Sequence, residues 1–162
     1  MAVRAMDAET RVARDDHGAI RLWLRMLATN RLVETRTRRL LQERYATTLP
    51  RFDLMAQLER APAGLKMGEL SKRMMVTGGN VTGITDGLAR DGLVERVPDP
   101  DDRRAILVRL TATGRRSFAA MAAEHERWIV EAFGALSRRE MATMAALLAR
   151  LKAHLRSLEE QA

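Results

Sequence analysis

The spacing of the apolar residues changes part-way along this 162-residue chain, and this change limits the folds open to it. Over most of the chain, apolar residues recur at three- and four-residue steps, which is typical of amphipathic helices. Further along, two short runs rich in β-branched residues, Leu93–Val97 and Ile106–Leu110, flank the charged segment Pro98–Ala105. Such runs around a polar turn predict a β-hairpin. The chain is therefore expected to be mainly α-helical with one small β-hairpin.

Four helices are predicted before the hairpin. The longest runs from Ile20 to about Tyr45. Pro50 suits the first turn of a short second helix, because its missing N–H costs nothing there. A third helix is expected over residues 67–74, and a fourth from about Gly79 to Asp91, with Gly92 as its C-terminal stop. Helix, turn, helix and hairpin in this order predict a winged helix-turn-helix.

Two further helices are predicted after the hairpin, and the sequence contains caps for them. Thr111 or Thr113 could cap a helix of about twenty residues. Ser137-Arg-Arg-Glu140 is a capping box that opens the last helix. Asp15 or Asp16 could cap the long first helix in the same way.

The last predicted helix carries an apolar stripe at helical spacing. The central part of the chain is too small to bury this stripe together with those of the other long helices. A second copy of the chain is the expected cover, so we expect a homodimer. The stripe consists of Met141, Met144, Leu147, Leu148, Leu151 and Leu155.

The charge of the chain favours a polyanionic partner. Twenty-eight Lys and Arg against 21 Asp and Glu give a net charge of +7, and the sequence pI is about 11.0. A surplus of this size is compatible with double-stranded DNA. The cations are spread along the chain, so any DNA-binding face has to be assembled by the fold.

Several classes of function are excluded by what the sequence lacks. There is no cysteine, which rules out disulfides, thiolate nucleophiles and zinc–thiolate sites. No apolar run approaches the roughly 20 residues that a membrane span needs, and the first residues are charged where a signal peptide is apolar. We therefore expect a cytoplasmic protein with no membrane partner.

Catalysis is not expected either. The three histidines, His17, His125 and His154, fall on separate predicted helices, which suits neither a metal site nor a catalytic relay. No phosphate loop, nucleophile elbow or dinucleotide fingerprint is present. The sequence therefore predicts no enzyme, no metal and no cofactor.

The fourth predicted helix has residues that suit contact with bases. The second helix of a helix-turn-helix presents its N-terminal side chains to base edges in the major groove. Thr77, Asn80, Thr82 and Thr85 fall there; Asn80 could pair with adenine and a Thr methyl could touch a thymine methyl. The same residue types also favour helix starts for local reasons, so this helix alone does not decide the function.

The charged hairpin loop strengthens the DNA-binding interpretation. It holds Asp101, Asp102, Arg103 and Arg104, and an Arg at such a tip can enter the adjacent minor groove. A carboxylate at Asp102 could hold the Arg104 guanidinium in one rotamer. The alternative is a winged helix that binds only protein, but that module needs no cationic tip.

The central segment resembles the MarR family of winged helix-turn-helix transcriptional regulators. The resemblance covers Leu70-Ser71 and then Val76–Gly114, and includes a D-x-R motif at Asp102-Arg103-Arg104. It implies that Arg104 enters the minor groove and that Asp102 orients it. It also implies an obligate homodimer on a pseudo-palindromic site, acting as a repressor that a small ligand releases.

The resemblance also divides the chain by role. Residues 15–47 would form an N-terminal helix for dimerisation and the ligand pocket, residues 48–111 the DNA-binding domain, and residues 112–160 the C-terminal dimerisation helices. One position departs from the family pattern: many relatives have a cation where this chain has Gly83. Phosphate contacts would then have to come from Arg51, Lys72, Arg73 or Arg103.

A small aromatic or acyl-CoA effector is the expected ligand. Leu22–Arg25, Thr48–Met55 and Leu65–Leu70 resemble the branch of the family that responds to hydroxycinnamoyl-CoA or related aromatic-acid thioesters. Arginines of the first helix could hold CoA phosphates, and a solvated helix face is the alternative for them. Aromatic and Met residues at helical spacing are also typical of core filling. The candidate pocket residues are Trp23, Met26, Asn30, Arg51, Met55 and Trp128.

Overall fold

The computed structural model describes residues 17–102 and 104–160. The candidate caps Asp15 and Asp16 and the wing residue Arg103 lie outside the described residues. The chain divides into two compact units, residues 1–123 and residues 124–162, and each is described by itself.

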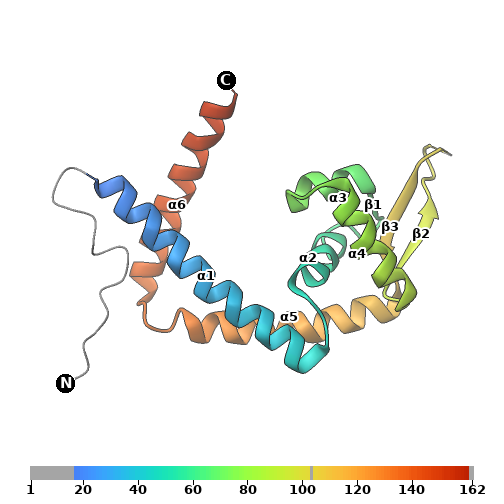
Figure 1. Ribbon diagram of the computed structural model, residues 1–162, viewed down its shortest axis with the longest axis horizontal. Coiled ribbons are helices and arrows are strands. Elements are labelled where there is room, and N and C mark those ends of the chain that lie inside the picture. The colour runs from blue at the N-terminus through green and yellow to red at the C-terminus, as the bar shows by residue number, and fades with distance from the viewer. Residues whose placement is uncertain (1–16, 103, 161–162) are drawn as a thin grey trace. The chain divides into compact units, whose positions relative to one another are not determined.

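The described residues form helices and three short strands, and Figure 1 shows their arrangement along the chain. The expected fold class, mainly helical with a small hairpin, is confirmed, and every expected helix is present within a few residues of its expected position. The elements are α1 (Gly18–Tyr45), α2 (Leu49–Glu59), β1 (Leu65–Lys66), α3 (Met67–Met74), α4 (Gly78–Arg90), β2 (Val94–Pro98), β3 (Ile106–Leu110), α5 (Ala112–Ala132) and α6 (Arg138–Glu159).

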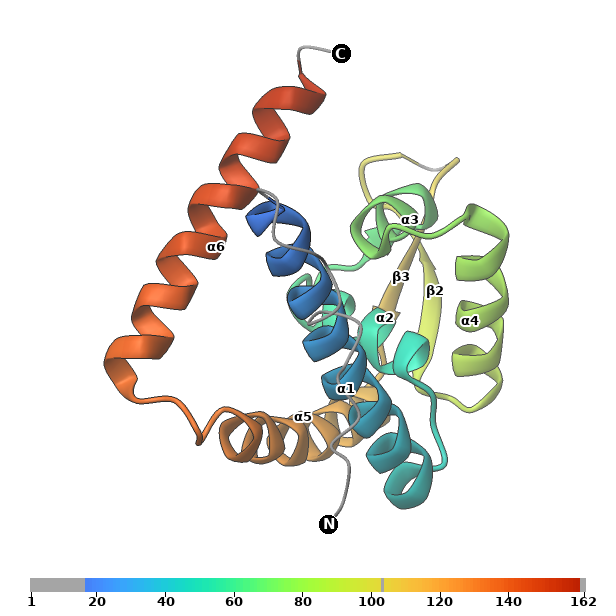
Figure 2. The same ribbon diagram turned by 60° about the vertical axis from the view of Figure 1, so that its left-hand side comes forward.

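The core of the first unit lies under α2, α3, α4 and the sheet, which Figure 2 shows gathered together. Leu54, Met55 and Leu58 of α2 are at most 1% exposed. They belong to one cluster of buried side chains with Leu70 of α3 and Val108 of β3. Because apolar burial is the main stabilising contribution to folding, this cluster holds the helix-turn-helix and the hairpin as one body.

The turn between α3 and α4 is fixed by local hydrogen bonds. Met75 ends α3 in the left-handed region with φ 54°, and its N–H donates to the Lys72 carbonyl. The Ser71 hydroxyl donates to the Val76 carbonyl at 2.6 Å, and Thr77 then caps α4 with extended backbone. These hydrogen bonds therefore fix the backbone of the turn that joins the two helices.

A three-stranded antiparallel sheet completes the first unit, with strand order β1-β3-β2. The predicted hairpin is confirmed, and Val94 pairs with Leu110 while Pro98 pairs with Ile106. Strand β1, which pairs Leu65 with Val108, was not predicted. It is only two residues long, too short to show the alternation of apolar and polar residues that marks a strand. Gly64 precedes it at φ +104°, where a Cβ would lie 2.9 Å from the Val108 carbonyl oxygen, so this close approach requires glycine.

The first half of α5 belongs to the same unit. The hydroxyl of Thr111 accepts a hydrogen bond from the Gly114 N–H at 2.9 Å, which confirms Thr111 as a cap. The rings of Phe118 and Phe52 have centroids 5.4 Å apart, and the Tyr45 hydroxyl donates to the Ala120 carbonyl at 3.1 Å.

The second unit contains the end of α5 and all of α6. The predicted capping box is confirmed: the Glu140 N–H donates to the Ser137 hydroxyl at 3.3 Å, and the Ser137 N–H donates to the Glu140 carboxylate at 2.8 Å. The apolar stripe of α6 is 37–52% exposed in the single chain. Its members are the six predicted residues together with Leu158.

Candidate nucleic-acid interface

The N-terminal part of α4 exposes three of the four predicted base-contacting residues. Thr77, Asn80 and Thr82 are exposed. The Thr82 hydroxyl donates to the Gly78 carbonyl at 3.0 Å, which leaves its oxygen lone pairs and its methyl group for contacts outside the helix. These side chains are short, so the helix itself can approach a partner closely.

The fourth of these residues, Thr85, is buried, so its expected contact with DNA is wrong. Thr85 is 0% exposed, and its hydroxyl donates to the Val81 carbonyl at 2.8 Å. The residue lies one helical turn after Val81 and one before Leu88, both of them core residues. Helical periodicity therefore places this polar residue on the buried face.

The exposed side of α4 next to α2 is a shallow groove of about 340 Å³. Gly79, Gly83 and Gly87, spaced four residues apart, contribute backbone and no side chain to it. A Cβ added at Gly79 or Gly83 would meet nothing within 4 Å. The groove is bounded by Thr48 and Arg51 on one side and by Asn80, Ile84 and Arg90 of α4.

Two arginines reach this groove. A Cβ at Gly87 would lie 3.5 Å from Arg51 Nη1 and 4.0 Å from Arg90 Nη2. Arg51 also forms an ion pair with Asp91 through its other terminal nitrogen. Its Nε is buried and has no acceptor within the described part of the chain. The groove is therefore cationic at the level of Gly87, and its hydrogen-bond donors exceed its acceptors.

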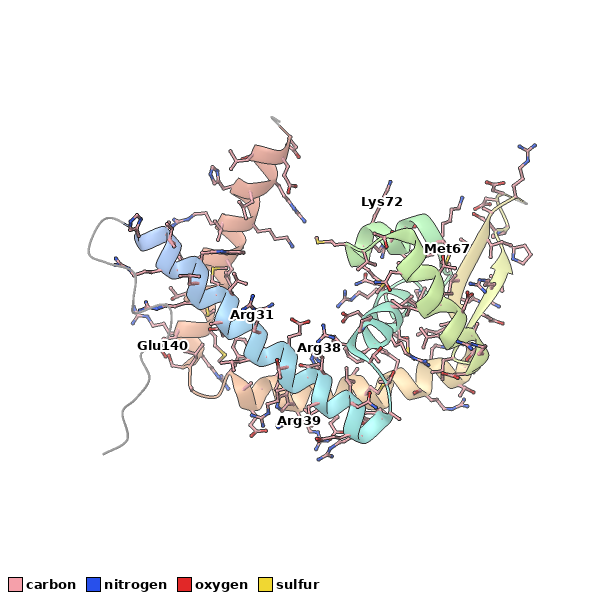
Figure 3. The ribbon with its side chains drawn as sticks, viewed as in Figure 1. Arg31, Arg38, Arg39, Met67, Lys72 and Glu140 are labelled. Carbon is pink, nitrogen blue, oxygen red and sulfur yellow. The ribbon has the colours of Figure 1, made fainter. Side chains whose placement is uncertain are left out.

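Two predicted phosphate contacts lie at the end of α3. Lys72 and Arg73 are exposed, and Figure 3 shows the Lys72 side chain pointing away from the helix. Arg73 forms an ion pair with Glu69 at 2.6 Å. Lys72 is thus the more readily available cation of the two.

The base of the wing is braced by Asp99, a residue that sequence analysis did not single out. Asp99 is 7% exposed. One carboxylate oxygen accepts from the Asp101 N–H at 3.0 Å, and the other pairs with Lys66 Nζ at 3.0 Å. Lys66 ends β1 and caps α3, so this pair ties the wing to the helix-turn-helix. The Lys66–Asp99 pair could not be predicted, because it depends on strand β1, which the sequence pattern does not indicate.

The pKa values of this pair move in the directions that the contacts require. Hydrogen bonding from the Asp101 N–H, and then from Lys66, lowers the pKa of the Asp99 carboxyl. The hydrogen bond and the charge of Asp99 raise the pKa of the Lys66 ammonium. Both groups are therefore charged throughout the neutral range.

The tip of the wing is ordered by Asp102. Its carboxylate accepts from the Arg104 N–H at 3.0 Å, and its carbonyl accepts from the Ala105 N–H at 2.9 Å. Arg104 itself is exposed. The expectation that Asp102 holds the Arg104 guanidinium is corrected here, because Asp102 holds the backbone of Arg104 in an Asx-type turn.

Two more arginines of the hairpin were missed by sequence analysis. Arg96 of β2 pairs with Asp86 of α4 at 2.5 Å, and Arg109 of β3 pairs with Glu95 at 2.8 Å. All four side chains are partly or largely exposed. Pairs of this kind contribute little to stability, but the first of them links the wing to α4.

The predicted pocket residues have different environments. Met55 is 0% exposed within the core of the first unit, so its expected place on a pocket wall is wrong. Arg51 lines the α4 groove. On α1, Trp23 and Asn30 are exposed and Met26 is half-buried. Trp128 belongs to the second unit and is 6% exposed, with its ring centroid 6.2 Å from that of His125.

Other kinds of site find no support in the described residues. Within residues 17–102 and 104–160, no group of three His, Asp or Glu side chains could hold a metal ion. None of the helices in these ranges combines the length and apolarity needed to cross a membrane.

Comparison with known proteins agrees with this geometry. The model of the MarR family matches residues 47–106. The chain is 34% identical over 126 residues to the transcriptional activatory protein BadR of Rhodopseudomonas palustris, covering 72% of this chain and 71% of that protein. These relatives are transcriptional regulators, in agreement with the expectation that the chain is not an enzyme.

Solved structures give the same result. A MarR family transcriptional regulator from Silicibacter pomeroyi is 33% identical with a TM-score of 0.75, covering 88% of this chain and 99% of the other. A mutant MarR of Escherichia coli in complex with operator DNA is 26% identical with a TM-score of 0.73, covering 86% of this chain and 99% of the other. With its helix-turn-helix and braced wing, this chain belongs to the MarR family of DNA-binding transcriptional regulators.

Proposed function

We propose that this regulator is a homodimer that represses transcription in the cytoplasm by binding a pseudo-palindromic operator, and that a small ligand releases it. One observation carries the DNA-contact part of this proposal. The exposed start of α4, with Thr77, Asn80 and Thr82, and the exposed Arg104 on a braced wing belong to one compact unit. A major-groove reader and a minor-groove cation are thereby presented together.

The contacts divide by chemistry. Asn80 and the two threonines read base edges, with Asn80 suited to the N6 and N7 atoms of adenine. Arg104 enters the minor groove, where the negative potential is strongest. Lys72, Arg73 and Arg103 contact phosphates, which position the protein without reading sequence. Residues 48–111 are the DNA-binding domain in this proposal.

Dimerisation is assigned to residues 15–47 and 112–160. The apolar stripe of α6 supports it, because seven large apolar side chains are more than a third exposed and monomeric proteins rarely leave such a patch open. Ile20, Leu22, Trp23 and Leu32 of α1 are also 48–74% exposed. A two-fold dimer would place its two recognition helices about 34 Å apart, one duplex turn.

The effector is a small aromatic acid or its CoA thioester. Trp23, Met26 and Asn30 of α1 remain candidate contacts for its ring, and Trp128 of the second unit remains a candidate by itself. Figure 3 shows Arg31, Arg38 and Arg39 along α1, and Arg38 pairs with Glu34 at 2.5 Å, which leaves Arg39 better suited to a CoA phosphate. A thermal-shift screen of aromatic acids and their CoA esters tests this assignment, since a ligand at 100 times its Kd stabilises by about 2.7 kcal/mol.

The function is tested by DNA titration at several salt concentrations. The probe is a duplex that wild-type protein selects from a randomised library, and binding is followed by fluorescence anisotropy. The logarithm of the association constant should fall steeply with the logarithm of salt concentration, by about 0.9 for each phosphate contact. Arg104→Ala should weaken binding substantially.

Arg60→Ala is the matched control for Arg104→Ala. Arg60 is an exposed arginine just after α2, and Glu59 beside it adjoins Leu110, at the end of β3 away from the wing loop. Its loss should leave DNA binding unchanged. A DNA affinity that neither falls with salt nor changes in Arg104→Ala would instead favour a winged helix that recognises protein. A reporter gene placed behind the selected site then tells repression from activation.

A further inference from the structure

The groove on α4 has a floor that consists of helix backbone. Gly79, Gly83 and Gly87 line it one helical turn apart. Asn80 and Ile84 border the groove, but a Cβ added at Gly79 or Gly83 would meet nothing within 4 Å, so the space above these two glycines is open. A partner can therefore approach the helix backbone more closely here than at any side-chain-bearing face.

Two arginines reach this groove from its edges. Arg51 reaches the groove from α2, and Arg90 reaches it from the last turn of α4. Their guanidinium groups lie 3.5 Å and 4.0 Å from the place where a Gly87 Cβ would be. Two guanidinium groups thus lie close to one position that carries no side chain.

The hydrogen-bond donors of these arginines are not all used by the protein. Asp91 takes one terminal nitrogen of Arg51, and Arg51 Nε is buried with no acceptor among the described residues. Arg90 forms no ion pair with another residue in the described ranges, so the groove carries two positive charges against the single carboxylate of Asp91. This balance suits one further oxyanion.

We propose that the groove over Gly83 and Gly87 is the seat of a DNA backbone phosphate, held between the guanidinium groups of Arg51 and Arg90. This proposal rests on the proposed function and specifies how it is carried out. A helix lying in the major groove has its flanks beside the sugar–phosphate strands. The groove is open and lies on a flank of the recognition helix, which suits a phosphate that belongs to a duplex.

The test measures DNA binding against salt concentration for Arg51→Gln and Arg90→Gln, on both the selected duplex and a random-sequence duplex. Each substitution should reduce the slope of log association constant against log salt by about one per protomer. The loss of affinity should be similar on both duplexes, because a phosphate contact carries no sequence information. Arg60→Gln is the matched control and should keep the wild-type slope.

Asp91→Asn separates the phosphate contact from the ion pair within the protein. This variant breaks the charge pairing of Arg51 but keeps both guanidinium groups in the groove. Its DNA affinity should equal or exceed that of the wild type. An affinity as low as that of Arg51→Gln would show that Arg51 acts only by holding Asp91, and would overturn its role as a phosphate ligand.

The remaining outcomes distinguish this proposal from the proposed function. Wild-type protein that binds neither duplex would refute the proposed function itself. Wild-type binding with a steep salt slope that Arg51→Gln and Arg90→Gln both retain would overturn only the phosphate seat. Inorganic phosphate and benzoate are then added alone in a thermal-shift assay. Stabilisation that requires both arginines, with an unchanged DNA slope, would assign the groove to a free anion and also overturn the proposal.

Discussion

Three threonines at or near the start of α4 have different burial, and burial separates their roles. Thr77 occupies the N-cap position without a side-chain capping hydrogen bond. Thr77 and Thr82 are both exposed, whereas Thr85 is buried in the core. The hydroxyl of Thr85 makes its hydrogen bond within the helix, where it donates to the Val81 carbonyl. Thr85 therefore has a side chain that suits contact with bases, but its burial keeps it from reaching DNA.

Paired substitutions at these positions give the first prediction. Thr85→Val should leave DNA affinity unchanged, and its unfolding free energy should change by about 1 kcal/mol or less, since one intrahelical hydrogen bond is exchanged for an apolar methyl. Asn80→Ala should keep the stability and lower the affinity for the selected duplex, by about 1 to 3 kcal/mol if the contact is bidentate. Urea unfolding and anisotropy measure the two quantities. A Thr85→Val variant that is folded and loses DNA binding would restore the original assignment.

Gly83 gives a second prediction at the same scale. Replacing it with Ala should raise the unfolding free energy by about 0.5 to 1 kcal/mol, because Ala loses less conformational entropy inside a helix. A Cβ there meets nothing within 4 Å, so no clash offsets this gain. The same Cβ would stand on the groove floor, and DNA binding should weaken.

Stability and affinity therefore move in opposite directions in Gly83→Ala, and no loss of folded protein could mimic this result. Urea unfolding and salt-dependent anisotropy on one preparation measure both quantities. If the variant is stabilised and binds DNA as well as the wild type does, the close approach of DNA to this helix face is refuted.

At the scale of elements, the wing depends on a contact with the strand that precedes α3. Lys66 and Asp99 join β1 to the start of the wing loop at 3.0 Å. Asp102 then orders the tip that carries Arg104. A loop fixed in this way loses less conformational entropy when it enters a groove.

The third prediction tests this brace. Asp99→Asn should weaken DNA binding but leave the salt slope at its wild-type value, because neither Lys66 nor Asp99 is a proposed phosphate contact. Lys66→Met should have the same effect, and the double variant should be no worse than either single one. A slope reduced by about one in Lys66→Met would instead identify Lys66 as a phosphate contact.

The pH dependence of the brace gives a fourth prediction. The pKa of Asp99 is lowered, so its contribution to stability is present above its ordinary value of 3.8 and is lost as pH falls through the lower folded value. The pKa of Lys66 is raised, so its contribution persists up to its ordinary value of 10.5 and is lost only above it. The difference in Tm between wild type and Asp99→Asn should be constant from neutral to weakly acidic pH and shrink below pH 3.8. Thermal unfolding across pH measures it, and a difference that grows in acid would contradict the brace.

The elements that the sequence predicted well are those whose signals are local. Gly92 stops α4 at φ +69°, and the capping box at Ser137 opens α6, because both depend on residues within one turn. Strand β1 could not be predicted, since two residues carry no period and their pairing partner lies far along the chain. The Lys66–Asp99 brace depends on β1 and was missed for the same reason.

In the candidate site, too, only features that depend on local spacing could be predicted. Thr77, Asn80 and Thr82 were placed correctly on an exposed face, whereas Thr85 and Met55 required knowledge of which way each helix faces the core. The arrangement of Arg51 and Arg90 over Gly87 joins two helices. No spacing along the sequence encodes such a pairing.

At the scale of the whole molecule, the exposed apolar stripe of α6 bears on whether the protein works as a single chain or as a dimer. Leu147, Leu151 and Leu155 are 38–52% exposed, although they follow the spacing of a buried helix face. A second copy that covers them would remove this surface from water, at about 25 cal/mol for each Å² of apolar area. In the proposed dimer, DNA binding would then depend on α6, which lies outside the proposed DNA-binding domain.

The fifth prediction is that Leu151→Asp dissociates the dimer and weakens operator binding, while each subunit stays folded. A charge at the centre of the stripe would be buried without a partner on association, which is strongly unfavourable. Ala153→Asp adds the same charge on the opposite face of α6, where successive residues are turned by 100°, and should remain a dimer with normal DNA binding. Sedimentation equilibrium and circular dichroism measure association and folding.

A Leu151→Asp variant that stays dimeric would place the interface elsewhere. If the variant is monomeric and still binds the full operator with wild-type affinity, the two recognition helices need not be held together, and the pseudo-palindromic mode of binding is refuted.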